Sequence, residues 1–236
     1  AGRTQSIKPT PVKRVAEQHH IPVMQPNDIR DTQWVEKIRT LAPDLIIVVA
    51  FGQIIPQSIL DIPPRGCINV HPSLLPRHRG ATPWQETILQ GDAKTGVTIM
   101  LMDAKMDHGP ILAQEEIMVA PSETTASLED KTAQIGITLL IESINRWTSE
   151  KITPQEQRHD QATYTRLLKK ESGKIDWSKS DQEIEHMIRA LNPWPGTWTE
   201  WNGKRVKVLH AHLDDGRLVI DELQPEGKKP MDARTF

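Results

Sequence analysis

Two polar residues, Asn69 and His71, lie two positions apart in the apolar stretch CINVH. Because side chains alternate along a β-strand, both would point to the same face. Asp107 belongs to a second stretch, MDHG, which follows another apolar run. An Asn amide can donate to a carbonyl oxygen that gains negative charge, and a His beside a carboxylate can move a proton near neutral pH. Together, the three side chains suit direct acyl transfer from a donor to an amine.

Other kinds of catalysis have less support in the sequence. It contains no G-x-S-x-G motif, and the single cysteine, Cys67, lies inside the predicted strand, so a covalent intermediate is disfavoured. Three histidines are close along the chain but lack HExxH or CxxC spacing, so we predict no metal site. Singly, a strand-end Asn, a buried His and a turn Asp each have ordinary structural roles. Their joint occurrence with SLLPRHRG favours a functional site.

The stretch SLLPRHRG leaves two alternatives open. Ser73 can hydrogen-bond within the turn or brace a ligand, and the turn is its more common role. The run Arg77, His78, Arg79 can either meet an anion or form a solvated loop.

Helices and strands alternate along the first part of the chain, as judged from hydrophobic periodicity. The alternation predicts an α/β fold with an open, mostly parallel twisted sheet. In such sheets ligands bind beyond the carboxyl ends of the strands, so Asn69, His71 and Asp107 would converge at one edge. Thr10 and Pro11 predict a helix start. We expect strands at 21–25, 44–52, 67–71, 95–103 and 111–119, and helices from 10, 34, 57, 82 and 125.

A change in composition divides the chain. We predict a main domain over residues 1–152, a polar linker over 153–172 that runs across the surface, and a small β domain over 173–236. The last part contains a helix at 181–191 and an Asn202-Gly203 hairpin turn between alternating strands. Such short strands are typical of a partial β-barrel.

Charge and cysteine content narrow the class of protein. There are 29 Lys and Arg against 31 Asp and Glu, a net charge of -2, so an RNA partner would need a local basic patch. One cysteine excludes a disulfide framework and fits a reducing cytosol. No apolar run approaches the roughly 20 residues that span a bilayer, so we predict no membrane association. The chain starts at Ala1 inside a loop-like stretch, and we expect that its beginning is missing.

Two long motifs make the chain recognisable. CINVHPSLLPRHRGATPW, followed by GDAKTGVTIMLMDAKMDHGPIL, resembles the folate-dependent formyltransferases, and among them those that act on methionyl initiator tRNA. KIDWSKS, RALNPWPGTW and QPEGKKPM extend the resemblance over nearly the whole chain. It implies a Rossmann-like formyltransferase domain and a C-terminal β-barrel-like domain. It also implies transfer of formyl from 10-formyltetrahydrofolate to the α-amino group of methionine on initiator tRNA, in translation initiation, by a cytoplasmic protein that we expect to be a monomer.

The resemblance also implies roles for individual residues. Asn69 and a protonated His71 would hold the formyl oxygen, and Asp107 would orient His71 and help to move the proton to folate N10. The folate site would be lined by Val49, Phe51, Gly52, Ile54, Ser73, Leu74, Leu75, Pro76, Asp103 and Gly109. Contacts to tRNA are expected from Arg3, Lys8, Lys204, Arg205, Lys207, Lys228 and Lys229.

Some features depart from the family pattern or allow other functions. Family members begin with a strand, a Gly-containing turn and a helix ahead of Ala1, and their C-terminal barrel is longer. Pro72 stands where many members carry a small residue. The alternatives are a glycinamide ribonucleotide formyltransferase, a sugar-nucleotide amine formyltransferase, and a non-catalytic folate- or RNA-binding module. Glycinamide ribonucleotide formyltransferases normally lack an appended β domain, so residues 174–231 favour the tRNA enzyme.

Overall fold

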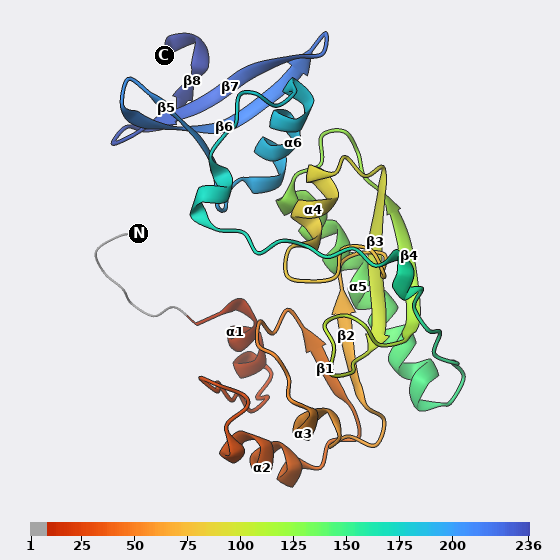
Figure 1. Cartoon of the computed structure of the whole chain (residues 1–236). Helices are drawn as coiled ribbons and strands as arrows, with labels where there is room; N and C mark the ends of the chain where they lie inside the picture. The colour runs from red at the N-terminus through yellow and green to blue at the C-terminus, as the bar shows by residue number, and fades with distance from the viewer. Residues whose placement is uncertain (1–8) are drawn as a thin grey trace.

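The computed structural model describes residues 9–236, which form two packed units (Figure 1). Thr10 caps the first helix as predicted, because its side chain accepts from the Lys13 N–H at 3.3 Å. Pro11 takes the first helical position, where a missing N–H leaves no bond unmade. Within the described residues, none of the helices has both the length and the apolar character to cross a membrane. The first unit contains α1 (Pro11–Gln18), α2 (Thr32–Leu41), α3 (Gln57–Leu60), α4 (Pro83–Leu89) and α5 (Thr125–Thr148).

The first sheet has four strands in the order β1-β2-β3-β4. β1 and β2 are parallel, whereas β3 is antiparallel to both β2 and β4. The α/β class is therefore confirmed, but the described sheet is mixed where the sequence predicted mostly parallel strands. The connection over 72–93 contains α4, which packs on α5 and α6, and the chain re-enters the sheet at the end where β2 leaves it, so β3 runs antiparallel beside β2. The strands are β1 (Ile46–Val49), β2 (Cys67–His71), β3 (Lys94–Leu101) and β4 (Ile111–Met118).

Residues 21–25, predicted as a strand, form no strand in the structure. Ile21 and Val23 remain 58% and 37% exposed. Apolar alternation specifies a strand only where one face becomes buried, and here neither side chain is.

Helix α5 covers one face of the first sheet (Figure 1). It occupies the predicted residues and begins with a capping box between Thr124 and Ser127. Its apolar side chains pack on a core in which Ile68 and Ile99 are fully buried. Burial of each such side chain contributes about 1.5–3 kcal/mol, so this packing holds β2 and β3 in place.

The second unit packs against the first through α6 (Asp181–Leu191), which contacts α4 and α5. Leu128 and Leu191 are buried together at this junction. A hydrogen bond of 2.6 Å from the Thr125 hydroxyl to the Ala190 carbonyl joins the two helices. The two units therefore share a packed core. Between them, residues 153–172 include the short 3-10 helices His159–Gln161 and Lys170–Gly173.

The second sheet is antiparallel, in the order β5-β6-β7-β8. The predicted Asn202-Gly203 turn joins β5 to β6, with both residues at positive φ, as tight hairpin turns require. α6 covers one face, where Ile184 and Ile188 pack on Val208. β5 and β8 are the edges of this sheet. Its elements are β5 (Thr197–Trp201), β6 (Lys204–Asp214), β7 (Arg217–Pro225), β8 (Met231–Asp232) and the final 3-10 helix Ala233–Thr235.

Candidate active site

The structure brings Asn69, His71 and Asp107 together at one face of β2. The Asn69 Nδ2 atom lies 3.5 Å from Asp107 Oδ1, and His71 Nδ1 lies 3.7 Å from Asp107 Oδ2. Asn69 and His71 share a face because they are two residues apart on the strand. The sequence also predicted that Asp107 would lie near them, but on the assumption that the carboxyl ends of their strands meet at one edge of the sheet.

Asp107 reaches the site because its loop folds back along β2. β3 ends at Leu101, opposite Ile68 near the start of β2, so the carboxyl ends of β2 and β3 lie at opposite ends of the sheet. Residues 102–110 must therefore return over the face that carries Asn69. Gly109 makes this possible, since a Cβ there would lie 2.1 Å from the Leu101 carbonyl oxygen.

His71 is buried, and its hydrogen bond identifies the tautomer. Nε2 lies 2.9 Å from the carbonyl oxygen of His78, which can only accept, so Nε2 carries the proton. Burial lowers the pKa of His71, and this outweighs the Asp107 carboxylate, which raises it. The resting ring is therefore neutral, with an unprotonated Nδ1 toward Asp107. The predicted role of a protonated His71, which would hold the formyl oxygen as the tetrahedral intermediate forms, concerns the reaction itself and stays a prediction.

Backbone groups of residues 72–82 complete the site. The Gly80 N–H donates to Asp107 Oδ2 at 2.7 Å, and the His78 carbonyl accepts from His71. Asp107 itself has a positive φ of 48°, which turns its carboxylate toward these groups. Sequence reasoning missed both backbone contacts. The only available signal was the Gly at the end of the RHRG turn.

The predicted folate residues from Ser73 to Pro76 mainly hold their own loop. Ser73 is buried and donates to the Arg77 carbonyl at 2.7 Å, so it takes the turn role. Leu75 is buried, and its N–H donates to the Thr98 hydroxyl at 3.2 Å. The peptide bond before Pro76 is cis, and Leu74 lies beside a cavity of about 200 Å³.

A second group of predicted folate residues forms an exposed apolar stretch after β1. Val49, Phe51 and Ile54 are 58%, 42% and 79% exposed. Val49 pairs with Val70, next to His71, so this stretch begins beside the candidate catalytic groups. Gly52 follows at a positive φ of 76°.

The last two predicted folate residues belong to the loop over 102–110. The carboxylate of Asp103 lies 2.6 Å from His108 Nδ1. Gly109 is buried against Leu101.

Two residues of the run from Arg77 to Arg79 meet an anion inside the protein, the Asp92 carboxylate, as one of the two alternatives allowed. Arg77 and His78 both contact Asp92, each at 2.6 Å. Burial alone would raise the pKa of Asp92, but these hydrogen bonds lower it overall. Arg79 is only 1% exposed and donates to Gln157 at 2.6 Å.

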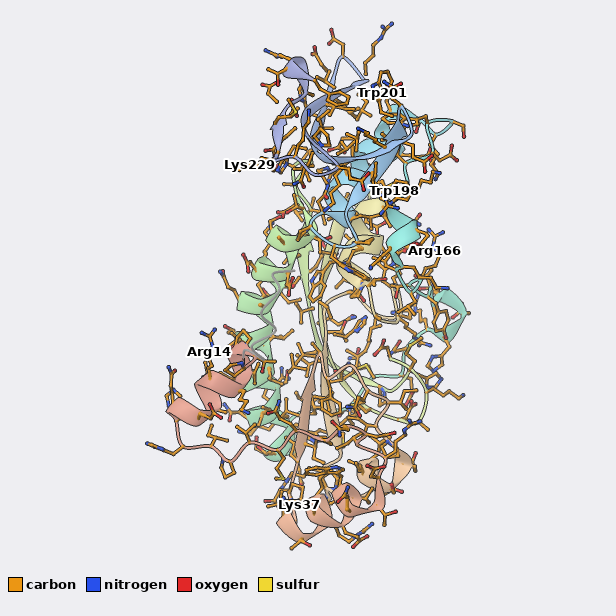
Figure 2. All side chains as sticks on the ribbon, turned by 90° about the vertical axis from the view of Figure 1, so that its left-hand side faces the viewer. Arg14, Lys37, Arg166, Trp198, Trp201 and Lys229 are labelled. Atoms are coloured by element: carbon orange, nitrogen blue, oxygen red, sulfur yellow. The ribbon has the colours of Figure 1, made fainter. Side chains whose placement is uncertain are left out.

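The predicted tRNA residues that the structure describes lie on the second sheet. Arg205 lies 3.8 Å above the Trp198 ring, and with Lys207 it lines a cavity of about 220 Å³. Figure 2 shows Lys229 and Trp201 on this sheet, above Arg166 of the connecting segment. Arg3 and Lys8 lie outside the described residues. The basic side chains on the sheet are all exposed: Lys204, Arg205, Lys207, Lys228 and Lys229.

Residues 9–236 offer little for metal or thiol chemistry. These residues contain no group of three or more His, Cys, Asp or Glu placed to hold a metal ion. Cys67 is buried, and burial raises the pKa of its thiol to about 11. A thiol of this kind is a poor nucleophile at neutral pH.

Comparisons with known proteins point to one family. The family model described as formyl transferase matches residues 1–144, and the model of the formyl transferase C-terminal domain matches residues 167–217. A methionyl-tRNA formyltransferase of Geotalea daltonii is 44% identical over 257 residues, covering 100% of this chain and 82% of the relative.

Solved structures share the fold. The methionyl-tRNA formyltransferase of Clostridium thermocellum has a TM-score of 0.67 and 20% identity, and covers 90% of this chain and 91% of its own. HypX of Aquifex aeolicus, in complex with tetrahydrofolic acid, has a TM-score of 0.66 and 17% identity over 85% of this chain and 39% of its own. They confirm the Rossmann-like α/β fold. Since the family model alone matches residues 1–144 of 236, the chain belongs to the formyltransferase family.

Proposed function

We propose that this formyltransferase moves the formyl group of 10-formyltetrahydrofolate to the α-amino group of methionyl initiator tRNA, for translation initiation. The observation that carries the proposal is the meeting of Asn69, His71 and Asp107 on one face of β2. The acceptor is inferred from the Geotalea daltonii methionyl-tRNA formyltransferase, 44% identical along the whole chain. The folate donor is inferred from the family and from the likeness to HypX with tetrahydrofolic acid.

The reaction begins when the methionyl amino nitrogen attacks the formyl carbon and the formyl oxygen becomes an oxyanion. Asn69 donates a side-chain N–H to this oxygen. One of its two side-chain N–H groups faces Asp107 at 3.5 Å, which leaves the other available to the substrate. A preorganised donor of this kind contributes about 10²–10³ in rate.

His71 takes up the proton that the attacking amine loses. Its Nδ1 is unprotonated in the resting tautomer and lies 3.7 Å from the Asp107 carboxylate. The imidazolium formed there is stabilised by Asp107. The proton then passes to folate N10 as the bond between N10 and the formyl carbon breaks, leaving formyl-methionyl-tRNA and tetrahydrofolate. Proton transfer of this kind contributes about 10²–10⁴.

Two surfaces suit the two substrates. The exposed side chains of Val49, Phe51 and Ile54 offer apolar area for the flat folate ring beside β2. Backbone groups of this stretch would hold the polar edge of the pterin-like ring. The exposed basic side chains of the second sheet suit tRNA phosphates, and the predicted contacts of Arg3 and Lys8 remain proposals.

We also propose a separate role for each of three parts of the chain. Residues 1–152 form the catalytic domain, 153–172 connect, and 173–236 contact tRNA, in a cytoplasmic monomer. Gel filtration with light scattering tests the oligomeric state, where a single species near the 26.7 kDa chain mass is expected and a dimer mass would contradict it.

A formylation assay with three acceptors tests the function. Methionyl initiator tRNA, glycinamide ribonucleotide and a sugar-nucleotide amine are each offered with 10-formyltetrahydrofolate, and formyl transfer is followed by mass spectrometry. We expect transfer to the tRNA alone. Faster transfer to either small amine would reject the proposed acceptor, and binding of folate and tRNA without transfer would identify a non-catalytic module.

A further inference from the structure

The segment that connects the two units contacts both catalytic loops. Residues 155–166, which we call the strap, run beside residues 76–82, the loop that follows β2. The Arg79 N–H donates to the Thr163 carbonyl at 2.9 Å, and the Thr165 N–H donates to the Arg79 carbonyl at 2.8 Å. The strap therefore forms a short strand-like pairing with the loop that supplies the backbone partners of His71 and Asp107.

The same strap holds the second catalytic loop, residues 102–110. The Gln157 side-chain N–H group donates to the carbonyl oxygens of Asp107 and Gly109, at 3.0 Å and 2.7 Å. The His159 ring stacks on the His108 ring, with centroids 4.0 Å apart and planes within 3°. The loop that carries the Asp107 carboxylate is thus attached to the strap at Asp107 itself and at the two residues that follow it.

One side chain joins the two attachments. Gln157 is 5% exposed, and its Oε1 accepts from Arg79 Nη2 at 2.6 Å while its Nε2 donates to Asp107 and Gly109. The amide orientation is unambiguous, because a guanidinium only donates and a carbonyl only accepts. A displacement of Gln157 would therefore change the distance between the loop of Arg79 and the loop of Asp107.

Arg79 is an unusual residue to bury for packing alone. It is 1% exposed, and its side-chain hydrogen bonds in the described residues go to Gln157, His159 and Tyr164, none of which is a carboxylate. Its Nε has no hydrogen-bond partner in the same residues. A buried charge without a counterion costs stability that an apolar side chain would not, which points to a role beyond packing.

We propose that Gln157, anchored by Arg79, is a positioning residue for formyl transfer: it holds the Asp107 carboxylate at the distance from His71 that proton transfer needs. The inference deepens the proposed function and rests on it. It assigns the strap to the catalytic apparatus. Misplacement of a catalytic group by about 1 Å can cost 10²-fold in rate, so the expected effect is large for a residue that touches no substrate.

Two variants separate positioning from stability. Gln157→Ala removes both attachments, whereas Gln157→Glu retains an acceptor for Arg79 and loses the N–H donors to the loop of Asp107. We expect both variants to lower kcat by about 10–100-fold, with folate and tRNA binding close to wild type. Gln161→Ala is the matched control, because that side chain is exposed in the same segment. Thermal unfolding of each variant shows whether it folds.

A second measurement does not depend on activity. His71 is faced by Asp107, His78 and Arg79; the Asp107 charge and the His78 carbonyl hydrogen bond raise its pKa, and the charges of His78 and Arg79 lower it. If Gln157 holds Asp107 in place, the His71 titration followed by NMR moves to lower pH in Gln157→Ala, which adds no charge, and stays unchanged in Gln161→Ala. A wild-type kcat together with an unchanged His71 titration in Gln157→Ala would overturn the inference. Failure of the wild-type protein to formylate tRNA would instead reject the proposed function, and the titration would still decide whether Gln157 positions Asp107.

Discussion

The catalytic loops and the second sheet hold their polar side chains in opposite ways. Around the catalytic site, His71, Ser73 and Arg79 are buried, and each has a partner inside the protein. On the second sheet, Lys204 and Lys207 are exposed. The first arrangement restricts the orientation of each side chain, and the second supplies charge without fixing geometry.

The difference follows from what each region is proposed to do. Acyl transfer needs groups that are oriented before the substrate arrives, because reorientation during the reaction costs activation free energy. A tRNA backbone presents many equivalent phosphates, so exposed and interchangeable cations are sufficient. Single substitutions should therefore have large effects on turnover in the first region and small, additive effects on affinity in the second.

Asp107→Asn should have the largest effect. The amide oxygen can still accept from the Gly80 N–H, so the loop is retained, but the charge that stabilises the His71 imidazolium is lost. We expect kcat to fall by about 10³–10⁴-fold while folate binding is retained. Single-turnover formylation together with folate binding by fluorescence checks this. Turnover near the wild-type value would remove Asp107 from the mechanism.

Gly109→Ala should have the next largest effect on kcat. Its cause is steric crowding, because the substitution removes no reacting group. A Cβ at this position would meet the Leu101 carbonyl oxygen at 2.1 Å, so the loop of Asp107 must move. We expect kcat to fall by about 10²-fold, with a loss of stability of about 2–4 kcal/mol measured by urea unfolding.

Gly203→Ala is the matched control in the second sheet. Nothing lies within 4 Å of a Cβ there, and only its positive φ of 72° opposes a side chain. A cost of about 1–2 kcal/mol with unchanged kcat is expected. Equal effects of the two alanines on kcat would contradict the contrast between the regions.

Local patterns predicted much of the fold, and they explain which parts of the site were found. α5 and α6 occupy the predicted residues because apolar periodicity and capping residues specify a helix from nearby sequence alone. The position of Asn69 and His71 on the same face of β2 follows from the alternation of side chains along a strand. The hairpin at Asn202-Gly203 follows from turn chemistry.

The features that sequence reasoning missed depend on contacts between distant segments. The direction of β3 depends on where the segment containing α4 re-enters the sheet. Hydrophobic periodicity predicts a strand but not its direction. Gln157 lies 50 residues from Asp107 in the chain, and nothing in its neighbouring residues marks the contact. The lowered pKa of His71 results from its burial, which outweighs the opposing charge of Asp107, so predicting it also needed the tertiary structure.

Loss of a single charge on the second sheet should have a smaller effect, and this effect should be on tRNA affinity and not on kcat. Lys204→Ala and Lys207→Ala should each weaken tRNA binding and reduce the salt slope of log K by about 1, with kcat at saturating tRNA unchanged. Filter binding at several salt concentrations checks this. Lys37→Ala makes the same charge change on α2, which Figure 2 shows at the opposite end of the molecule from Lys229. An equal effect of Lys37→Ala would show a general charge effect rather than a local surface.

The smallest effect is expected at Glu123, near the junction of the two units. Its carboxylate accepts from Lys131 and Ser127, each at 2.5 Å, and its carbonyl accepts from Arg189 of α6 at 2.6 Å. Burial would raise the pKa of Glu123, but the Lys131 and Ser127 hydrogen bonds lower it overall. Because the folded protein holds the carboxylate ionised, this contribution is complete above the unfolded pKa of 4.5 and is lost as the pH falls through the lower folded value.

Glu123→Gln should therefore destabilise the protein by about 1–2 kcal/mol at pH 7, and the difference from wild type should shrink as the pH falls below 4.5. Urea unfolding at several pH values measures this. Glu129→Gln is the control, since Glu129 is exposed on α5. A difference that grows on acidification would mean that Glu123 is held protonated, and the junction would then owe its stability to the packing of Leu128 and Leu191 rather than to charge.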